Sequence, residues 1–254
     1  MKSRSIDHYI YFGTALRYLQ DVKSGTSVHD KGYILDNIDG FLDRVVAFEL
    51  PVTERACDKL ILTRDTLRGV PKDHVLTDDE ALGLTKIMDD VRRTLFAEAG
   101  GNVAFIVTDK RIDVNKLLRN VPALFAPGVA DSLPDIAQHD MTEAGRCIAF
   151  ELPTAAAFHI LRATEDALRH FYCCVVRQKR VKPLLWGRMV TSLRERKKQP
   201  PAALLDNLDN IRRSFRNPTQ HPEKIYDIQE VQDLFSLCAD VVNRMVTSKS
   251  WASS

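Results

Sequence analysis

The sequence has no long apolar run and few cysteines, and each absence argues against a class of protein. No segment approaches the roughly 20 apolar residues that a membrane-spanning helix needs, and no basic stretch followed by an apolar one opens the chain. We therefore expect neither a membrane span nor a signal peptide. The five cysteines form no CxxC pair, so neither a disulfide framework nor a zinc knuckle is expected. A soluble protein of the reducing cytoplasm fits these absences best.

The remaining composition is that of a globular protein. Of its 254 residues, 44% are hydrophobic and 28% are charged, which suffices for a packed core and a charged surface. This length allows one large domain or two small ones. No group of His, Cys, Asp and Glu residues has the spacing of a metal site, so we expect no metal ion and no cofactor.

Apolar residues recur at helical spacing along most of the first half of the chain. The pattern predicts helices over residues 5–23, 33–49 and 51–68. Thr77, with Glu80 three residues later, has the form of a capping box that opens a further helix. Residues 103–107 differ, because this short apolar run between turn residues predicts a strand. A single strand needs a partner, which would be a small hairpin or a second copy of the chain.

A loop-rich passage separates the two halves of the sequence. Pro122, Pro127 and Pro134 interrupt the helical pattern, and we place the domain boundary after residue 136. Residues 1–136 are expected to form an α-rich N-terminal domain of unknown role with at most a small β element. Residues 137–254 are expected to form an antiparallel helical bundle. The fold class is therefore predicted to be mainly α.

The helices predicted in the second half are amphipathic. The first spans about residues 136–150, and Pro153 opens a long second helix that runs to about Val176. Asp227 begins a capping sequence for the last helix, whose apolar residues form a continuous face.

Charge is distributed unevenly along the chain. Residues 1–136 carry 18 Lys and Arg against 21 Asp and Glu, whereas residues 137–254 carry 18 against 13. Within residues 177–198 the basic residues outnumber a single glutamate, which is the pattern of an electrostatic nucleic-acid site. A solvated helix face and loop explains the same run. The candidate RNA-binding residues in this passage are Arg194, Arg196, Lys197 and Lys198.

Arg216 and His221 lie five positions apart on either side of Pro218, between two amphipathic helices. An arginine offers a permanent cation with a planar fork of donors that suits phosphate. A histidine accepts or donates a proton near neutral pH. Because proline disfavours helical geometry in the preceding residue, we expect the helix to end at Asn217 and the chain to turn, which would direct Arg216 and His221 at one point.

The spacing of this pair is weakly specific. Given the Arg and His content, about two R-x(4–6)-H matches are expected by chance, and Arg68 with His74 forms a second match in a loop. Nothing around that second pair resembles a site. Without further context, Arg216 is better explained as a cation at a helix end, and His221 as a turn residue.

Glu165 occupies the apolar seam of the long second helix, between Leu161 and Leu168. A carboxylate in such a position must find a cation or hydrogen-bond donors. One interpretation is a structural ion pair inside the bundle. The other is that Glu165 orients Arg216 or another arginine of a site, with Arg162 as a further supporting residue.

The order of these features resembles the HEPN superfamily of small helical bundles. The similarity covers residues 138–247, with the segment 158–165 on the second helix and Arg216-Asn217 leading to His221 before the last helix. The family motif is R-x(4–6)-H, commonly with a polar residue directly after the arginine. One toxin branch carries a tyrosine two residues after the histidine as a nucleotidylation site; Glu223 stands there in this chain.

The resemblance implies a metal-independent endoribonuclease, a toxin or an anti-phage effector, that cleaves RNA at a dimer cleft. Arg216, His221 and Asn217 would then be the catalytic residues, supported by Glu165 and Arg162. A homodimer through the C-terminal bundle is expected, and an antitoxin or sensor partner stays open. Other family members have lost catalysis, so the alternative is a non-catalytic adaptor that binds RNA or a protein.

Overall fold

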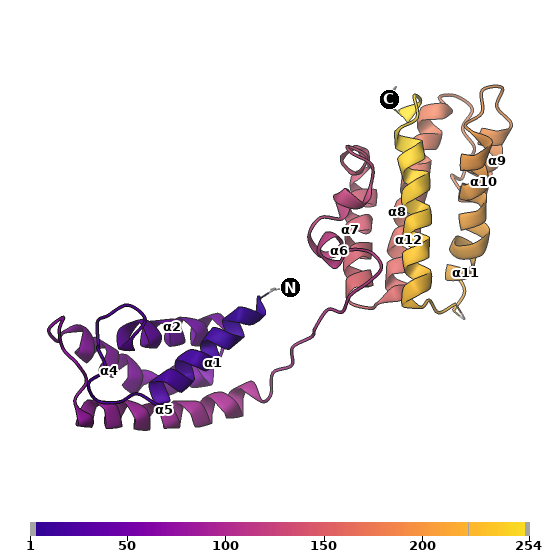
Figure 1. Ribbon diagram of the computed structural model, residues 1–254. Helices are drawn as coiled ribbons and strands as arrows, with labels where there is room; N and C mark the ends of the chain where they lie inside the picture. The colour runs from indigo at the N-terminus through magenta and orange to yellow at the C-terminus, as the bar shows by residue number, and fades with distance from the viewer. Residues whose placement is uncertain (1–3, 223, 252–254) are drawn as a thin grey trace. The chain divides into compact units, whose positions relative to one another are not determined.

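Two compact units make up the chain, Met1–Phe105 and Ile106–Ser254, in the computed structural model, which describes residues 4–222 and 224–251 (Figure 1). Glu223 lies outside the described residues. Each unit has its own hydrophobic core. Helices build both units, and the prediction of a mainly α protein is confirmed.

The N-terminal unit packs its helices around Phe41, Leu60, Met88 and other buried apolar residues. Thr77 accepts a hydrogen bond from the backbone N–H of Glu80, and the Glu80 carboxylate accepts one from the Thr77 N–H, so the predicted capping box is present. The helices of this unit are α1 (Ile6–Gln20), α2 (Ile34–Ala47), α3 (Pro51–Ala56), α4 (Asp58–Arg68) and α5 (Asp78–Ala99).

The predicted strand over residues 103–107 is wrong. No strand occurs among the described residues, and the segment is an extended connection between the units. Val103 and Phe105 are 79% and 86% exposed, and no backbone hydrogen bond among the described residues joins the segment to a neighbouring strand. A short apolar run forms a strand only when a second strand accepts its hydrogen bonds, and here none lies beside it.

The units divide at residues 105/106 instead of 136/137, where the sequence placed the boundary. The reason is that the proline-containing passage packs into the C-terminal core. Leu117, Val121, Phe125 and Val129 are all buried there. This passage contains the short α6 (Val114–Arg119) and the 3₁₀ turns η1 (Val121–Leu124) and η2 (Ala130–Ser132).

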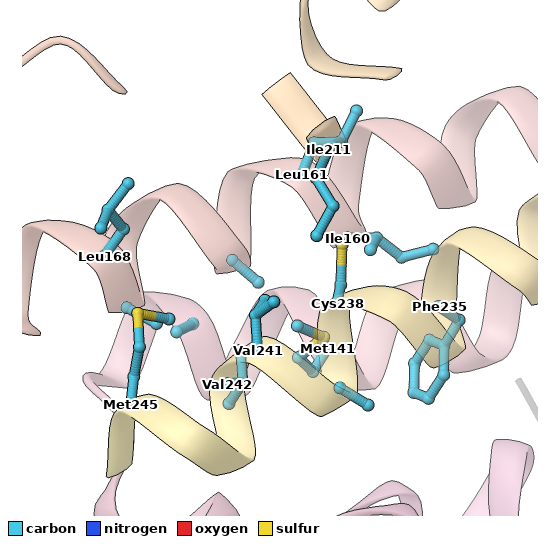
Figure 2. Close-up of a cluster of buried hydrophobic side chains, with 14 of the residues drawn as sticks. Met141, Ile160, Leu161, Leu168, Ile211, Phe235, Cys238, Val241, Val242 and Met245 are labelled. Carbon is cyan, nitrogen blue, oxygen red and sulfur yellow. The ribbon is translucent and has the colours of Figure 1, made fainter. Parts of the chain in front are cut away.

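Three long helices form the centre of the C-terminal unit: α7 (Asp135–Ala149), α8 (Pro153–Val175) and α12 (Ile228–Val246) (Figure 1). Pro153 occupies the first turn of α8, and the Asp227 side chain accepts hydrogen bonds from the N–H groups of Gln229 and Glu230 at the start of α12. These are the helix starts that the sequence predicts. Figure 2 shows the core between them, where Met141 of α7, Leu168 of α8 and Met245 of α12 are among the packed side chains.

The bundle is not antiparallel throughout, because α8 and α12 run in the same direction. Tyr226, just before α12, donates its N–H to the Thr154 hydroxyl in the first turn of α8, at 3.3 Å. At the other end the rings of His170 and Trp251 lie 4.4 Å apart. The shorter α9 (Trp186–Arg194) and α10 (Ala202–Ile211) form an antiparallel pair beside these two helices, and the Trp186 indole donates to the Leu208 carbonyl.

The helix of α10 does not end at Asn217, so the predicted break is wrong. It continues through a π-helical turn, η3 (Arg212–Arg216), into α11 (Asn217–Thr219), and Asn217 has helical φ and ψ of −66° and −51°. In a regular α-helix the ring of Pro218 would clash with the carbonyl four residues back. The wider π turn shifts the bonding to the fifth residue back, as the Asn217 N–H to Arg212 carbonyl bond shows, and Pro218 follows without breaking the helix.

Candidate functional site

Arg216 is held against α8 by Glu165. The Nε and Nη2 atoms of Arg216 each donate to one Glu165 oxygen, Oε2, at 3.2 Å. The carboxylate side chain is only 12% exposed and the arginine 31%. The contact between Glu165 and Arg216 is compatible with both sequence interpretations of Glu165, and it fixes a guanidinium beside the middle of α8.

The second oxygen of Glu165 binds another arginine. Arg169, one turn further along α8, donates to Oε1 at 2.7 Å. Its side chain is 48% exposed, whereas Arg216 lies deeper. One carboxylate thus serves two cations, and the net charge of this cluster is positive.

Arg162 belongs to a second cluster, which centres on a residue that the sequence reasoning missed. Asp140 of α7 has no exposed side-chain surface and accepts hydrogen bonds from Arg162 through both carboxylate oxygens. The Nδ1 atom of His159 lies 2.9 Å from Asp140 Oδ1. Burial alone raises the pKa of Asp140, but the hydrogen bonds from Arg162 and His159 outweigh burial and hold this pKa below its usual range. Asp140 is therefore ionised at neutral pH.

A signal for Asp140 was present in the sequence. Ala137, Met141 and Ala144 are buried on the same stripe of α7, so a carboxylate lies within an apolar helix face. This is the pattern that singled out Glu165 on α8.

Members of both clusters line one pocket of about 310 Å³ between α8 and the η3–α11 segment, which we call the α8 pocket. Its charged members come from α8 and from η3. The residues that line it are Phe158, His159, Leu161, Arg162, Glu165, Arg216, Thr219 and Gln220.

His221 and Asn217 line a different pocket, together with Arg213, Pro218 and Lys224. The predicted convergence of Arg216 and His221 on one point is thus absent from this structure. Five residues along a helix rotate a side chain by about 140° relative to the first, and the helix persists through Thr219. His221 is exposed, and no hydrogen bond from the described residues fixes its ring.

The basic passage divides into bound and exposed residues. Arg194, at the end of α9, donates to Asp206 of α10 at 2.6 Å. Arg196, Lys197 and Lys198 are exposed in the loop that follows. A third pocket, of about 640 Å³, is lined mainly by residues of α9 and η3 and includes four arginines, Arg188, Arg194, Arg212 and Arg213.

The second R-x(4–6)-H match does not form a site. Arg68 pairs with Asp39 through both carboxylate oxygens at 2.8 Å, and His74 pairs with Glu80, the capping residue of α5. Separate structural partners therefore hold the two residues.

The described residues contain neither a metal-binding cluster nor a membrane-spanning helix. No group of three or more His, Cys, Asp and Glu side chains could hold a metal ion there. Nor does any described helix combine the length and the apolar character needed to cross a membrane.

Comparison with known proteins adds no assignment. No family model, curated protein or solved structure matches this chain.

Proposed function

We propose that the C-terminal unit is a metal-independent endoribonuclease of the HEPN type. The observation that carries the proposal is the α8 pocket, in which the Arg216 guanidinium is fixed by Glu165 and an imidazole, His159, lines the same cavity. A fixed cation beside a group that transfers protons is the minimal equipment for phosphodiester cleavage without a metal. The sequence motif offers the same two groups, since Arg216 is a cation for phosphate and His221 is a side chain that can transfer a proton.

In the proposed reaction Arg216 binds the scissile phosphate and stabilises the charge that develops on its oxygens. The 2′-hydroxyl of the substrate attacks phosphorus while its proton passes to a base, and the P–O5′ bond breaks as the 5′ oxygen takes up a proton. The products are a 2′,3′-cyclic phosphate and a 5′-hydroxyl. His221 takes part in these proton transfers, and Asn217, which lines the same pocket as His221, hydrogen-bonds to the substrate.

The biological part of the proposal follows from the resemblance to HEPN proteins. The enzyme is proposed to act as a homodimer through the C-terminal bundle, as a toxin or an anti-phage effector that cuts cellular or viral RNA. For such a toxin or effector we also propose a partner protein, an antitoxin or a sensor, that holds the enzyme inactive. Light scattering on the purified protein tests the dimer, and a fully active monomer would contradict it.

A cleavage assay in the presence of EDTA tests the catalytic proposal directly. The wild-type chain should cut RNA and leave cyclic phosphate ends, whereas Arg216→Ala and His221→Ala should each lose at least about 100-fold in rate. His74→Ala, in the second motif match, is the matched control and should cut normally. Cleavage at the wild-type rate by both site variants would refute the proposal.

A non-catalytic module is the second candidate function, and one observation favours it. Arg216 and His221 line separate pockets, and Glu165 already occupies two of the donor groups of Arg216. On this alternative the exposed residues Arg196, Lys197 and Lys198 bind RNA or an acidic partner, and the bundle serves as an adaptor. RNA binding by the wild-type chain without any cleavage would support this alternative.

A further inference from the structure

The carboxylate of Asp140 determines which nitrogen of His159 carries a proton. Asp140 is ionised and fully buried, so its oxygens only accept hydrogen bonds. The contact of 2.9 Å to Nδ1 therefore requires a proton on Nδ1. In the neutral ring this leaves Nε2 unprotonated, with its lone pair available.

Nε2 of His159 is free to meet a ligand. No hydrogen bond from the described residues reaches this atom; His159 lines the α8 pocket, and its side chain is 29% exposed. An ionised carboxylate behind an imidazole is the arrangement that fixes the tautomer and stabilises the imidazolium in proton-transfer enzymes. Arg162, which also binds Asp140, keeps this carboxylate in place.

The same pocket offers free donors for an anion. Arg162 uses Nε and Nη2 for Asp140, and Arg216 uses Nε and Nη2 for Glu165. The Nη1 groups of both arginines have no hydrogen-bond partner among the described residues. A phosphate oxygen accepts such N–H groups, so the pocket can bind the anion without breaking either ion pair.

Charged groups from three elements act on His159. Asp140 of α7 carries a negative charge, as does Glu165 of α8, while Arg162 of α8 and Arg216 of η3 carry positive charges. Asp140 contacts the ring directly, and the two arginines line the same pocket as the ring.

We propose that the α8 pocket binds the scissile phosphodiester and that His159 is the general base of the reaction. This rests on the proposed ribonuclease function and assigns its two proton transfers to two histidines. Nε2 of His159 takes the proton of the 2′-hydroxyl as the O2′–P bond forms. The P–O5′ bond breaks, and a protonated His221 gives its proton to the 5′ oxygen; its pocket and the α8 pocket are both lined by residues of the segment 216–221.

Two substrates separate the base from the acid. The first is an oligonucleotide with a single ribose, and the second replaces its 5′ leaving oxygen by sulfur. A thiolate leaves without protonation because its conjugate acid has a pKa near 8.5, far below that of an alcohol. His221→Ala should therefore be slow on the oxygen substrate and recover to nearly the wild-type rate on the sulfur substrate.

The variant of His159 is chosen to retain the fold. His159→Asn keeps an N–H donor for Asp140 but has no Nε2 atom. It should lose at least about 100-fold in rate on both substrates and should lose the rise of rate with pH at the acidic end. His139→Ala, on the exposed residue next to Asp140, is the matched control and should retain both the rate and the pH profile.

Each outcome decides between the two proposals. If the wild-type chain cuts the oxygen substrate and His159→Asn cuts it equally well, the role of His159 is refuted while the ribonuclease function stands. If the wild-type chain cuts neither substrate, the ribonuclease function fails and the role of His159 fails with it.

A measurement on the wild-type protein keeps the inference testable should His159→Asn unfold. Nitrogen NMR of the imidazole must show the Nδ1–H tautomer for His159, and an Nε2–H tautomer would overturn the assignment.

Discussion

Glu165 and Arg216 come from segments 51 positions apart in sequence and meet through a single carboxylate oxygen, while the other oxygen of Glu165 holds Arg169. The contact joins η3 to α8 at the level of the α8 pocket. Its position explains why a charged residue is tolerated on the apolar seam of α8: the carboxylate is neutralised by two cations.

Replacing Glu165 by Gln should destabilise the C-terminal unit by about 1 kcal/mol, because two arginines lose a charged acceptor in a partly buried site. Arg169→Gln, which removes only the exposed partner, should cost less than about 0.5 kcal/mol. Urea unfolding followed by tryptophan fluorescence measures both changes. Equal losses of unfolding free energy in the two variants would contradict the larger contribution expected from the contact between Glu165 and Arg216.

Helix caps test whether the two units unfold separately. Asp227→Ala removes the cap of α12 and should cost about 1 kcal/mol. Both tryptophans, Trp186 and Trp251, belong to the C-terminal unit, so their fluorescence should report this loss. Thr77→Ala weakens the cap of α5 in the N-terminal unit by a similar amount and should leave the tryptophan transition unchanged. A shift of that transition in Thr77→Ala would show that the units unfold together.

Gly145 should tolerate no side chain. A Cβ there would lie 2.6 Å from Val121 Cγ2 and 2.7 Å from the Leu117 carbonyl oxygen. Gly145→Ala should therefore cost about 2 kcal/mol through overpacking, although alanine is the better helix former. Gly83→Ala on α5 meets nothing within 4 Å and should stabilise its helix by about 0.5–1 kcal/mol. Thermal unfolding by circular dichroism compares the two, and opposite signs are expected.

Asp140 makes the stability of the C-terminal unit depend on acid. Its folded-state pKa lies below the ordinary value of 3.8, so the unfolded chain binds a proton first as pH falls. The contribution of Asp140 is therefore present in full above about pH 4 and is lost as pH falls through the folded pKa. Asp140→Asn should lower the free energy of unfolding by about 2 kcal/mol at neutral pH. Between neutral pH and about pH 3, the free energy of unfolding of this variant should fall less than that of the wild-type protein. Urea unfolding at several pH values measures both proteins. Parallel curves of unfolding free energy against pH would argue against this contribution of Asp140.

The exposed basic loop after α9 provides a test of RNA binding. Changing Arg196, Lys197 and Lys198 to Ser should weaken binding across RNA sequences and reduce the slope of log affinity against log salt by about 2, if each contacts one phosphate of a single strand. Filter binding at several salt concentrations measures the slope. Arg194→Ser should change it less, since Asp206 already neutralises Arg194. An unchanged slope would show that the loop is a solvated surface that does not contact RNA phosphates.

Local patterns in the sequence predicted the helices better than the contacts between them. The Thr77 capping box, Pro153 and Asp227 are signals within one turn of chain, and each begins a helix where expected. The strand over 103–107 failed because a strand depends on a distant partner that no local pattern reveals.

The candidate site shows the same division. Glu165 could be singled out because a charge on an apolar seam needs a partner, and Asp140 fits the same rule on α7. The pairing of Asp140 with His159 depends on how α7 packs against α8, which the sequence leaves open. The persistence of the helix through Pro218 depends on the π turn before it, and so does the separation of Arg216 from His221.

The exposed connection at Val103 and Phe105 also bears on how such a protein can evolve. Both side chains lie in solvent, and neither belongs to the core of either unit. Recombination at this point would exchange one whole unit while leaving every helix of the other intact. The C-terminal bundle could thus acquire a new N-terminal neighbour without losing any residue of its own core.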